Sequence, residues 1–356
     1  MPPNSASSAT NSVFAFSAET LDVISAYQAQ FHQRWNHLSD PHVRALAWLL
    51  DAPDLLDGQA PQWQGKIAHL LDQNERDQIA IWLHALDSEP VKLEELHFYI
   101  GSLPSTRLGL YAEKLMAFYF HKQQMLVAHS LQVRAAKNDT VGEFDFLLRR
   151  NDALVHWEFA TKFYLLETSQ AGFLADDFVG PNLADSLGAK VNKILDRQLT
   201  LSSHPAAQIH LTETVTSAQA LIKGWLFYQN PLCEVPGTMG IAKTHCRGYW
   251  RGCSDVLASI DHVNSVADES ENKVYAILPR LRWLAPAKIK MRETMTAVQV
   301  REVLEDYFSS QHSPLILATL RQQGDHALEV YRGFVVPDDW SSKAAETRKL
   351  AVRKIL

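Results

Sequence analysis

The chain has 356 residues, of which 46% are hydrophobic and 21% are charged, as in an ordinary soluble globular protein. This composition excludes a disordered or collagen-like chain, and the lack of any run of about 18 apolar residues argues against a transmembrane helix. The net charge of −6 conceals an asymmetry, because residues 1–104 carry 5 basic and 13 acidic side chains, whereas residues 273–356 carry 14 and 9. A basic C-terminal quarter leaves a polyanionic partner open.

Residues 1–11 are rich in proline, serine, alanine and threonine, without the basic and apolar stretches of a signal peptide. We expect residues 1–17 to form a disordered tail. The three cysteines, Cys233, Cys246 and Cys253, are too few for a disulfide framework, so we expect a reducing, cytoplasmic location. Their spacing around His245 matches no common zinc-binding pattern.

Residues 18–104 are expected to form a helical N-terminal region. Apolar side chains recur there at intervals of three and four residues, which is typical of helices with one buried face. The recurrence is seen at Leu46, Leu49, Leu50, Ile67, Leu70 and Leu71. Asp40 followed by Pro41 predicts a helix start, with a capping side chain ahead of a proline in the first turn.

Residues 105–230 are expected to form a second unit. Residues 108–127 predict a helix that is apolar on nearly every side and therefore buried, so Glu113 within it needs a partner. Alternating patterns over 131–135, 141–149 and 154–166 predict three strands that form an antiparallel meander. A helix over 185–201 and a strand over 220–228 complete the order α-β-β-β-α-β.

Residues 231–356 are expected to form a C-terminal α/β extension packed on this core. After a loop region that contains glycines and cysteines, the patterns predict a strand at 274–278 and a helix at 297–309. A last pair of strands is predicted at 315–320 and 327–336. The fold class is thus α+β, with a mixed sheet flanked by helices.

Acidic side chains on two neighbouring strands are the main chemical signal. Side chains two residues apart share a strand face, which puts Glu143 and Asp145 on one face of a strand. Glu158 and Lys162 share one face of the next strand, about 13 Å apart if that strand is fully extended. Adjacent strands lie about 4.8 Å apart, so Asp145 and Glu158 become neighbours if the register aligns them. Two carboxylates in a half-buried sheet repel, and Mg²⁺ or Mn²⁺ would neutralise them. A solvated sheet face shows the same pattern and is the other interpretation.

These residues, in this order of elements, resemble the PD-(D/E)XK nuclease superfamily, which has the restriction-endonuclease-like fold. The broad resemblance covers residues 105–228. More narrowly, the segments 142–148, 156–164, 180–182 and 332–337 resemble an uncharacterised bacterial family, a domain of unknown function that has been grouped with this superfamily. The narrow resemblance runs from about residue 105 to residue 340.

The resemblance implies a metal-dependent nuclease that hydrolyses phosphodiester bonds of nucleic acid. It implies that Asp145 and Glu158 hold Mg²⁺ or Mn²⁺ together with the backbone carbonyl of Phe159. Lys162 would stand by the attacking water, and Glu113 would be an outer carboxylate of the metal site.

One residue departs from the superfamily pattern: its lysine usually follows the glutamate by two residues, and Ala160 occupies that place. Lys162 is then a displaced equivalent, or the protein is a degenerate member that serves as a nucleic-acid-binding or protein-interaction module. A third, purely structural interpretation makes Glu113 and Lys162 a buried ion pair. Gln198 resembles half of the Gln-x-x-x-Tyr motif of one nuclease branch, but Ser202 stands where the tyrosine would be.

A run of basic residues in the C-terminal quarter alternates with apolar ones, as on an exposed strand. It consists of Arg280, Arg282, Lys288, Lys290 and Arg292. Such a run can track the phosphate backbone of nucleic acid, so we expect nucleic acid as a partner there. No membrane partner is expected.

Overall fold

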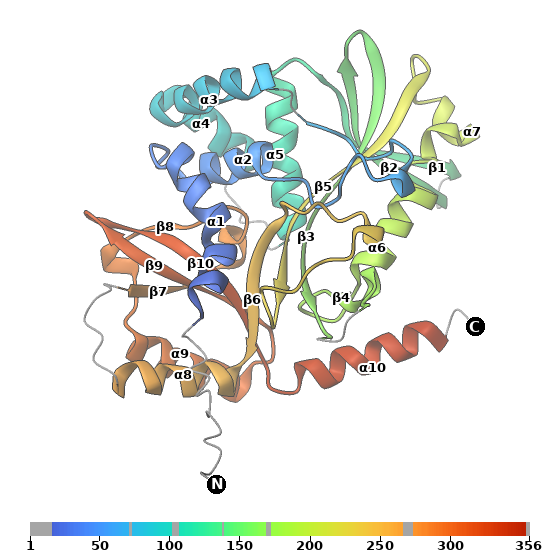
Figure 1. The fold of residues 1–356 in the computed structure, drawn as a ribbon. Helices are drawn as coiled ribbons and strands as arrows, with labels where there is room; N and C mark the ends of the chain where they lie inside the picture. The colour runs from blue at the N-terminus through green and yellow to red at the C-terminus, as the bar shows by residue number, and fades with distance from the viewer. Residues whose placement is uncertain are drawn as a thin grey trace.

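One mixed sheet runs through the molecule (Figure 1). The computed structural model describes residues 16–70, 73–101, 107–136, 139–168, 172–265 and 273–353, and in these ranges ten strands join in that sheet. The strands are β1 (Leu126–Ala136), β2 (Asp139–Arg150), β3 (Ala153–Leu166), β4 (Phe178–Val179), β5 (Val215–Tyr228), β6 (Cys246–Gly252), β7 (Lys273–Leu278), β8 (Lys288–Lys290), β9 (Leu315–Gln323) and β10 (His326–Val336). The predicted α+β class and mixed sheet are confirmed.

The strand order is β1-β2-β3-β5-β6-β10-β9-β7, with β4 paired to β3 and β8 paired to β10. Parallel pairing is found in the middle of the sheet, from β3 through β5 and β6 to β10. The outer pairs are antiparallel, including the predicted meander of β1, β2 and β3. Because β3 and β5 are parallel, the chain must cross over between them, and the crossover carries the predicted helix.

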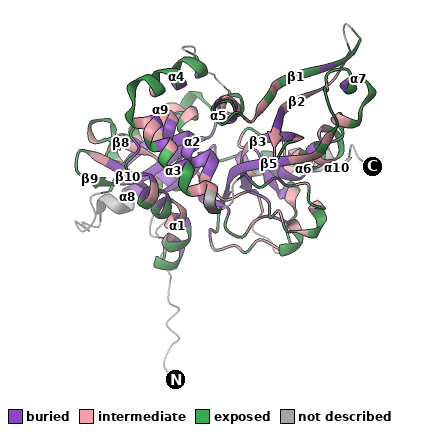
Figure 2. Cartoon of the chain, turned by 90° about the horizontal axis from the view of Figure 1, so that it is seen from above, coloured by how far each residue is buried: buried purple, intermediate pink, exposed green. Residues whose placement is uncertain are grey.

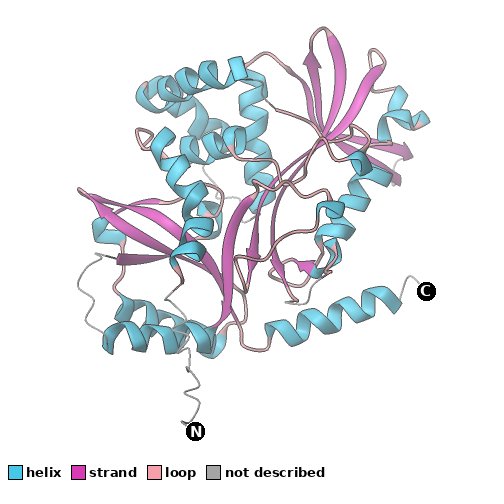
Figure 3. Cartoon of the chain, in the orientation of Figure 1, coloured by secondary structure: helices cyan, strands magenta, loops and turns pink. Residues whose placement is uncertain are grey.

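Helices cover both faces of the sheet (Figure 3). They are α1 (Ala18–Trp35), α2 (Pro41–Asp51), α3 (Gln73–Ser88), α4 (Pro90–Ile100), α5 (Leu108–Lys122), α6 (Leu187–Lys193), α7 (Pro205–Gln208), α8 (Cys253–Ser265), α9 (Ala297–Ser310) and α10 (Trp340–Arg353). In the described ranges, no helix is both long and apolar enough to cross a membrane. From α5 to β5 the predicted order α5, β1, β2, β3, α6 and β5 is present, with the short β4 added before α6 and the short α7 added after it.

Residues 18–100 contain the helices α1 to α4, and the predicted capping signal marks the start of α2. Asp40 caps α2, since its carboxylate accepts hydrogen bonds from the backbone N–H groups of His42 and Val43. The predicted start at Pro41 is confirmed. Residues 1–15 of the predicted tail and the boundary at residue 104 lie outside the described residues.

The helical interpretation of Ile67 and Leu70 is wrong. Ile67 forms a parallel bridge with Ala220 of β5, and the N–H of Ala68 donates to the Ala220 carbonyl at 2.9 Å. Pro61 and nearby glycines interrupt any helix in this stretch, so its apolar residues reach the core in an extended conformation.

The C-terminal third contributes strands to the same sheet. The strands predicted at 274–278, 315–320 and 327–336 are β7, β9 and β10, and the helix predicted at 297–309 is α9. The region we took for a loop contains β6 and α8. Because β6 pairs with both β5 and β10, it joins the two halves of the sheet.

Aromatic side chains fill the centre, where the buried residues gather between helices and sheet (Figure 2). Trp48 of α2 stacks on Trp225 of β5, with 6.4 Å between the ring centroids. Arg332 of β10 lies over the Trp225 ring and pairs with Glu329, whose Oε1 is 2.6 Å from Arg332 Nε. Both charged side chains are 0% exposed. If either side chain were removed, the other would be left as a buried charge without a partner, which would destabilise the fold.

We predict that Arg332→Met lowers the free energy of unfolding by about 3–5 kcal/mol, because it leaves the Glu329 carboxylate buried without its cation. Urea unfolding followed by circular dichroism measures this. Arg292→Met, at a side chain that is 77% exposed, is the control and should change stability by less than about 0.5 kcal/mol. Similar effects of the two variants would contradict the prediction.

Candidate functional site

The register of β2 and β3 brings Asp145 and Glu158 together. Phe146 pairs with Trp157, and the two acidic residues are the next positions along each strand. Asp145 Oδ2 accepts a hydrogen bond of 2.9 Å from the backbone N–H of Phe159, the residue that follows Glu158 on β3. The predicted cross-strand contact is therefore present.

Glu158 is buried and fully hydrogen-bonded. Its side chain is 1% exposed, with Oε1 2.8 Å from His156 Nε2, and the Gln198 side-chain amide donates to Oε2. Burial lowers the pKa of His156 to about 4, so the ring is neutral and its single N–H serves Glu158 when that group is ionised. The other ring nitrogen, Nδ1, is buried without a partner in the described structure.

The two carboxyl groups hold protons that exposed carboxyl groups would lose. Burial, reinforced by the charge of Glu158, raises the pKa of Asp145 to about 8. Burial likewise raises the pKa of Glu158 to about 7. Near neutral pH the pair therefore retains a proton, which a cation of sufficient affinity would have to displace.

Lys190 of α6 is the cation beside this pair. Helix α6 and the π-helical turn Ile194–Gln198 pack on the β3 face that carries Glu158 and Ala160. Lys190 Nζ donates to Gln198 Oε1 at 3.3 Å, so it is one hydrogen bond removed from Glu158. Burial and the nearby Lys162 ammonium lower the pKa of Lys190, while Asp145 and Glu158 act in the opposite direction.

Lys162 is held elsewhere. Its ammonium donates to Asp185 Oδ2 at 2.6 Å, and the Tyr164 hydroxyl donates to the same oxygen at 3.2 Å. The Lys162 side chain is 28% exposed, at the edge of the site. It does not contact either acidic residue of the pair.

Glu113 also has partners of its own on β1. Its Oε1 is 2.8 Å from His129 Nε2 and accepts from the Ser130 hydroxyl at 2.9 Å. Its charge still raises the pKa of Asp145 and of Glu158, so it lies in their neighbourhood without touching them. The interpretation in which Glu113 and Lys162 pair with each other is wrong, since each has another partner.

The carboxylate oxygens of Asp145 and Glu158 are the type of ligand that hard divalent cations such as Mg²⁺ prefer. In the described ranges, no three or more His, Cys, Asp and Glu side chains group so as to hold a metal ion. A cation here would therefore rest on Asp145 and Glu158, with the Phe159 carbonyl and water completing the shell. Mg²⁺ is commonly bound in this way, through one or two carboxylates, and keeps several waters.

The basic run of the C-terminal quarter lies in the other half of the sheet. It spans a 3₁₀ turn (Arg280–Arg282), β8 and a second turn (Met291–Glu293), so it is not the single exposed strand we expected. Since β8 pairs with β10, the strands β5 and β6 separate it from β3. The lysines near the acidic pair come from α6 and β3 instead.

Lys190 was not predicted from the sequence as a site residue, and Gln198 was given no role. Both lie on the inner side of α6 and its following turn, among the buried Leu187, Val191 and Ile194. A lysine within the apolar stripe of a short helix was the signal that could have identified it.

Comparison with known proteins identifies one family. A family model described as a domain of unknown function (DUF1853) matches residues 44–336. No curated protein and no solved structure matches the chain. The chain therefore belongs to the DUF1853 family.

Proposed function

We propose that this protein is a metal-dependent nuclease with a restriction-endonuclease-like core. The observation that carries the proposal is the pair of buried carboxyl groups of Asp145 and Glu158, which the register of β2 and β3 places opposite each other. The order α5, β1, β2, β3, α6, β5, with β3 and β5 parallel, supports the proposed core.

Asp145 and Glu158 would hold Mg²⁺ or Mn²⁺ with the Phe159 carbonyl. Such a cation would supply Lewis-acid stabilisation of the charge that builds on the phosphate. His156 and Gln198 keep the Glu158 carboxylate in one orientation, each through a hydrogen bond to a different oxygen. They are positioning residues in this proposal.

In this proposal, Lys190 has the role of the lysine that the superfamily pattern places two residues after the glutamate, where this chain has Ala160. It reaches the site from α6, and its ammonium sits within the field of both carboxylates. An ammonium there can orient the water that attacks the phosphodiester and stabilise negative charge in the transition state. Lys162, paired with Asp185, would at most contact the substrate backbone.

The second candidate is a degenerate nuclease fold that binds nucleic acid or a protein without cleaving. Ala160 favours it, as does the hydrogen bonding of both Glu158 oxygens within the protein. Labelled DNA and RNA distinguish the two candidates. Binding that weakens with salt but never leads to cleavage in Mn²⁺, on single-stranded, double-stranded, branched and RNA substrates, supports the degenerate module.

We predict that Asp145→Asn and Glu158→Gln each lower the cleavage rate by at least about 100-fold, because each removes a charge that the metal and the transition state need. Neither should lower the melting temperature, since each relieves repulsion inside the sheet. Glu213→Gln, at an exposed ion pair with Arg149, is the control and should leave cleavage unchanged. Full activity in Glu158→Gln would reject the site.

We predict different outcomes for the two lysines near the pair. Lys190→Met should reduce cleavage about 100-fold or more and leave Mn²⁺ affinity nearly unchanged, whereas Lys162→Met should cost less than about tenfold. Single-turnover rates and Mn²⁺ titrations measure both effects. The reverse ranking would restore Lys162 as the catalytic lysine.

We predict that Mn²⁺ affinity rises between about pH 6 and pH 8. The pKa values of about 8 for Asp145 and about 7 for Glu158 mean that binding must release protons, so affinity should increase up to about tenfold per pH unit for each proton released. Above about pH 8 the rise should level off. Calorimetry in buffers of different ionisation enthalpy counts the protons, and binding without proton release contradicts the prediction.

A further inference from the structure

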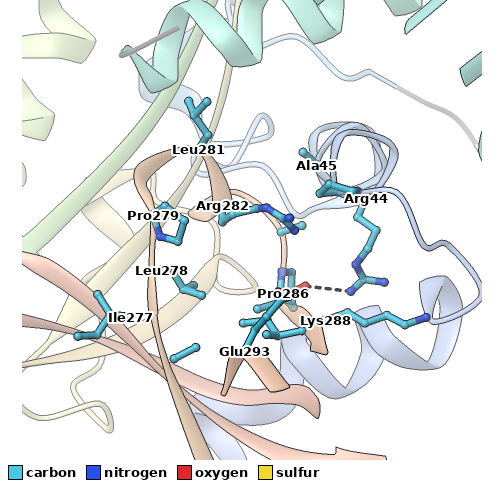
Figure 4. Close-up of a pocket in the computed structure, with 15 residues that line it drawn as sticks. Arg44, Ala45, Ile277, Leu278, Pro279, Leu281, Arg282, Pro286, Lys288 and Glu293 are labelled. Carbon is cyan, nitrogen blue, oxygen red and sulfur yellow. Dashed lines mark hydrogen bonds between the residues drawn. The ribbon is translucent and has the colours of Figure 1, made fainter. Parts of the chain in front are cut away.

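A pocket with three cationic side chains lies between α2, the end of β7 and the segment that leads to β8 (Figure 4). Its volume is about 170 Å³, which leaves room for several water-sized molecules. Its walls are largely apolar, and its cations are Arg44, Arg282 and Lys288. The apolar lining includes Pro41, Ala45, Leu278, Pro279, Leu281 and Ile289.

Arg44 contributes a buried charge that no carboxylate of the described structure contacts directly. The residue is 3% exposed, and its guanidinium donates to the carbonyls of Trp35 at 2.9 Å and Pro286 at 2.9 Å. The second of these hydrogen bonds is drawn in Figure 4. Neutral carbonyls satisfy its N–H groups without neutralising its charge.

Lys288, which is partly buried, and Arg282, which is exposed, add two more positive charges. Lys288 Nζ donates to the carbonyls of Asn36 at 2.7 Å and Leu38 at 3.5 Å. Arg282 has no hydrogen-bond or ion-pair partner within the described ranges, and its side chain extends from its turn toward α2 (Figure 4). These positive charges repel one another. As a result, Arg282 lowers the pKa of Arg44, and Arg44 lowers the pKa of Lys288.

The carboxylates that act on these cations are occupied elsewhere. Asp87 accepts from the backbone N–H groups of Ser39 and Asp40, Asp325 pairs with the neighbouring His326, and Glu329 pairs with Arg332. Glu293 lines the rim, and its side chain is 56% exposed. The pocket thus gathers three positive charges opposite one rim carboxylate.

We infer that this pocket binds a phosphate group, either as inorganic phosphate or as a small organic phosphate monoester. Guanidinium and ammonium groups together favour an oxyanion of more than one charge, and Arg282 offers an unused planar fork of donors. The apolar walls suit the organic part of a monoester. This site is separate from the acidic pair of β2 and β3 and does not depend on the proposed nuclease activity.

Isothermal titration of the full chain with inorganic phosphate, phenyl phosphate and benzoate tests the inference. EDTA in the buffer prevents phosphate from binding through a metal at the acidic pair. The test variant is Arg282→Ala, whose exposed side chain is not needed for folding. The control is Arg280→Ala, at the other end of the same turn, where the guanidinium lies over the Trp283 ring at 5.4 Å.

We expect saturable binding of phosphate or phenyl phosphate, weakened about tenfold or more in Arg282→Ala and less than about twofold in Arg280→Ala. Tighter binding of phenyl phosphate identifies a monoester site, and tighter binding of inorganic phosphate identifies a site for the free ion. No binding by the unmodified chain, equal losses in both variants, or benzoate binding as tightly as phenyl phosphate would overturn the inference.

Discussion

The burial of two carboxyl groups side by side in one sheet is the constraint on which the candidate site depends. Asp145 and Glu158 meet because the β2–β3 register is fixed by the pairs next to them, in which residues after Asp145 lie opposite residues before Glu158, beginning with Phe146 and Trp157. A pair of negative charges in that place is unstable unless a proton, a metal ion or a cationic side chain compensates it. Hydrogen bonds from His156 and the Phe159 amide reduce the cost and leave the charge itself to be neutralised.

Ala160 and Lys190 are linked through the packing of α6. Ala160 is 5% exposed and lies in the apolar cluster that includes Val191 and Ile194. A lysine at position 160 would put an ammonium into that cluster, whereas the small alanine lets α6 approach the sheet. The same approach brings Lys190 and Gln198 toward Glu158. The alanine at position 160 and the cation on α6 are therefore two aspects of one packing arrangement.

The sequence predicted elements well where periodicity was regular, and poorly where close packing required small residues. Alternation along β2, β3, β9 and β10 reflected their burial, so these strands were found. Strand β6 was taken for a loop because Cys246 and Gly248 weaken its pattern. Gly248 belongs there because a Cβ would lie 2.5 Å from the Phe227 ring. The carboxylate pair followed from two local patterns, whereas Lys190 could not be placed, since its position depends on how α6 packs.

Charged side chains in and beside the sheet fall into three groups, which differ in how their charge is neutralised and so in what each can still bind. Glu329 and Arg332 neutralise each other, so this pair contributes to stability and offers nothing to a ligand. The carboxyl pair of β2 and β3 is compensated by protons, which a cation can replace. The cations Arg44 and Lys288 donate to carbonyl oxygens and, for Arg44, to a ring nitrogen of His32, and these neutral partners satisfy hydrogen bonds and leave the positive charge unneutralised. Because β5 and β6 separate the last two groups, each can meet a ligand of its own sign independently of the other.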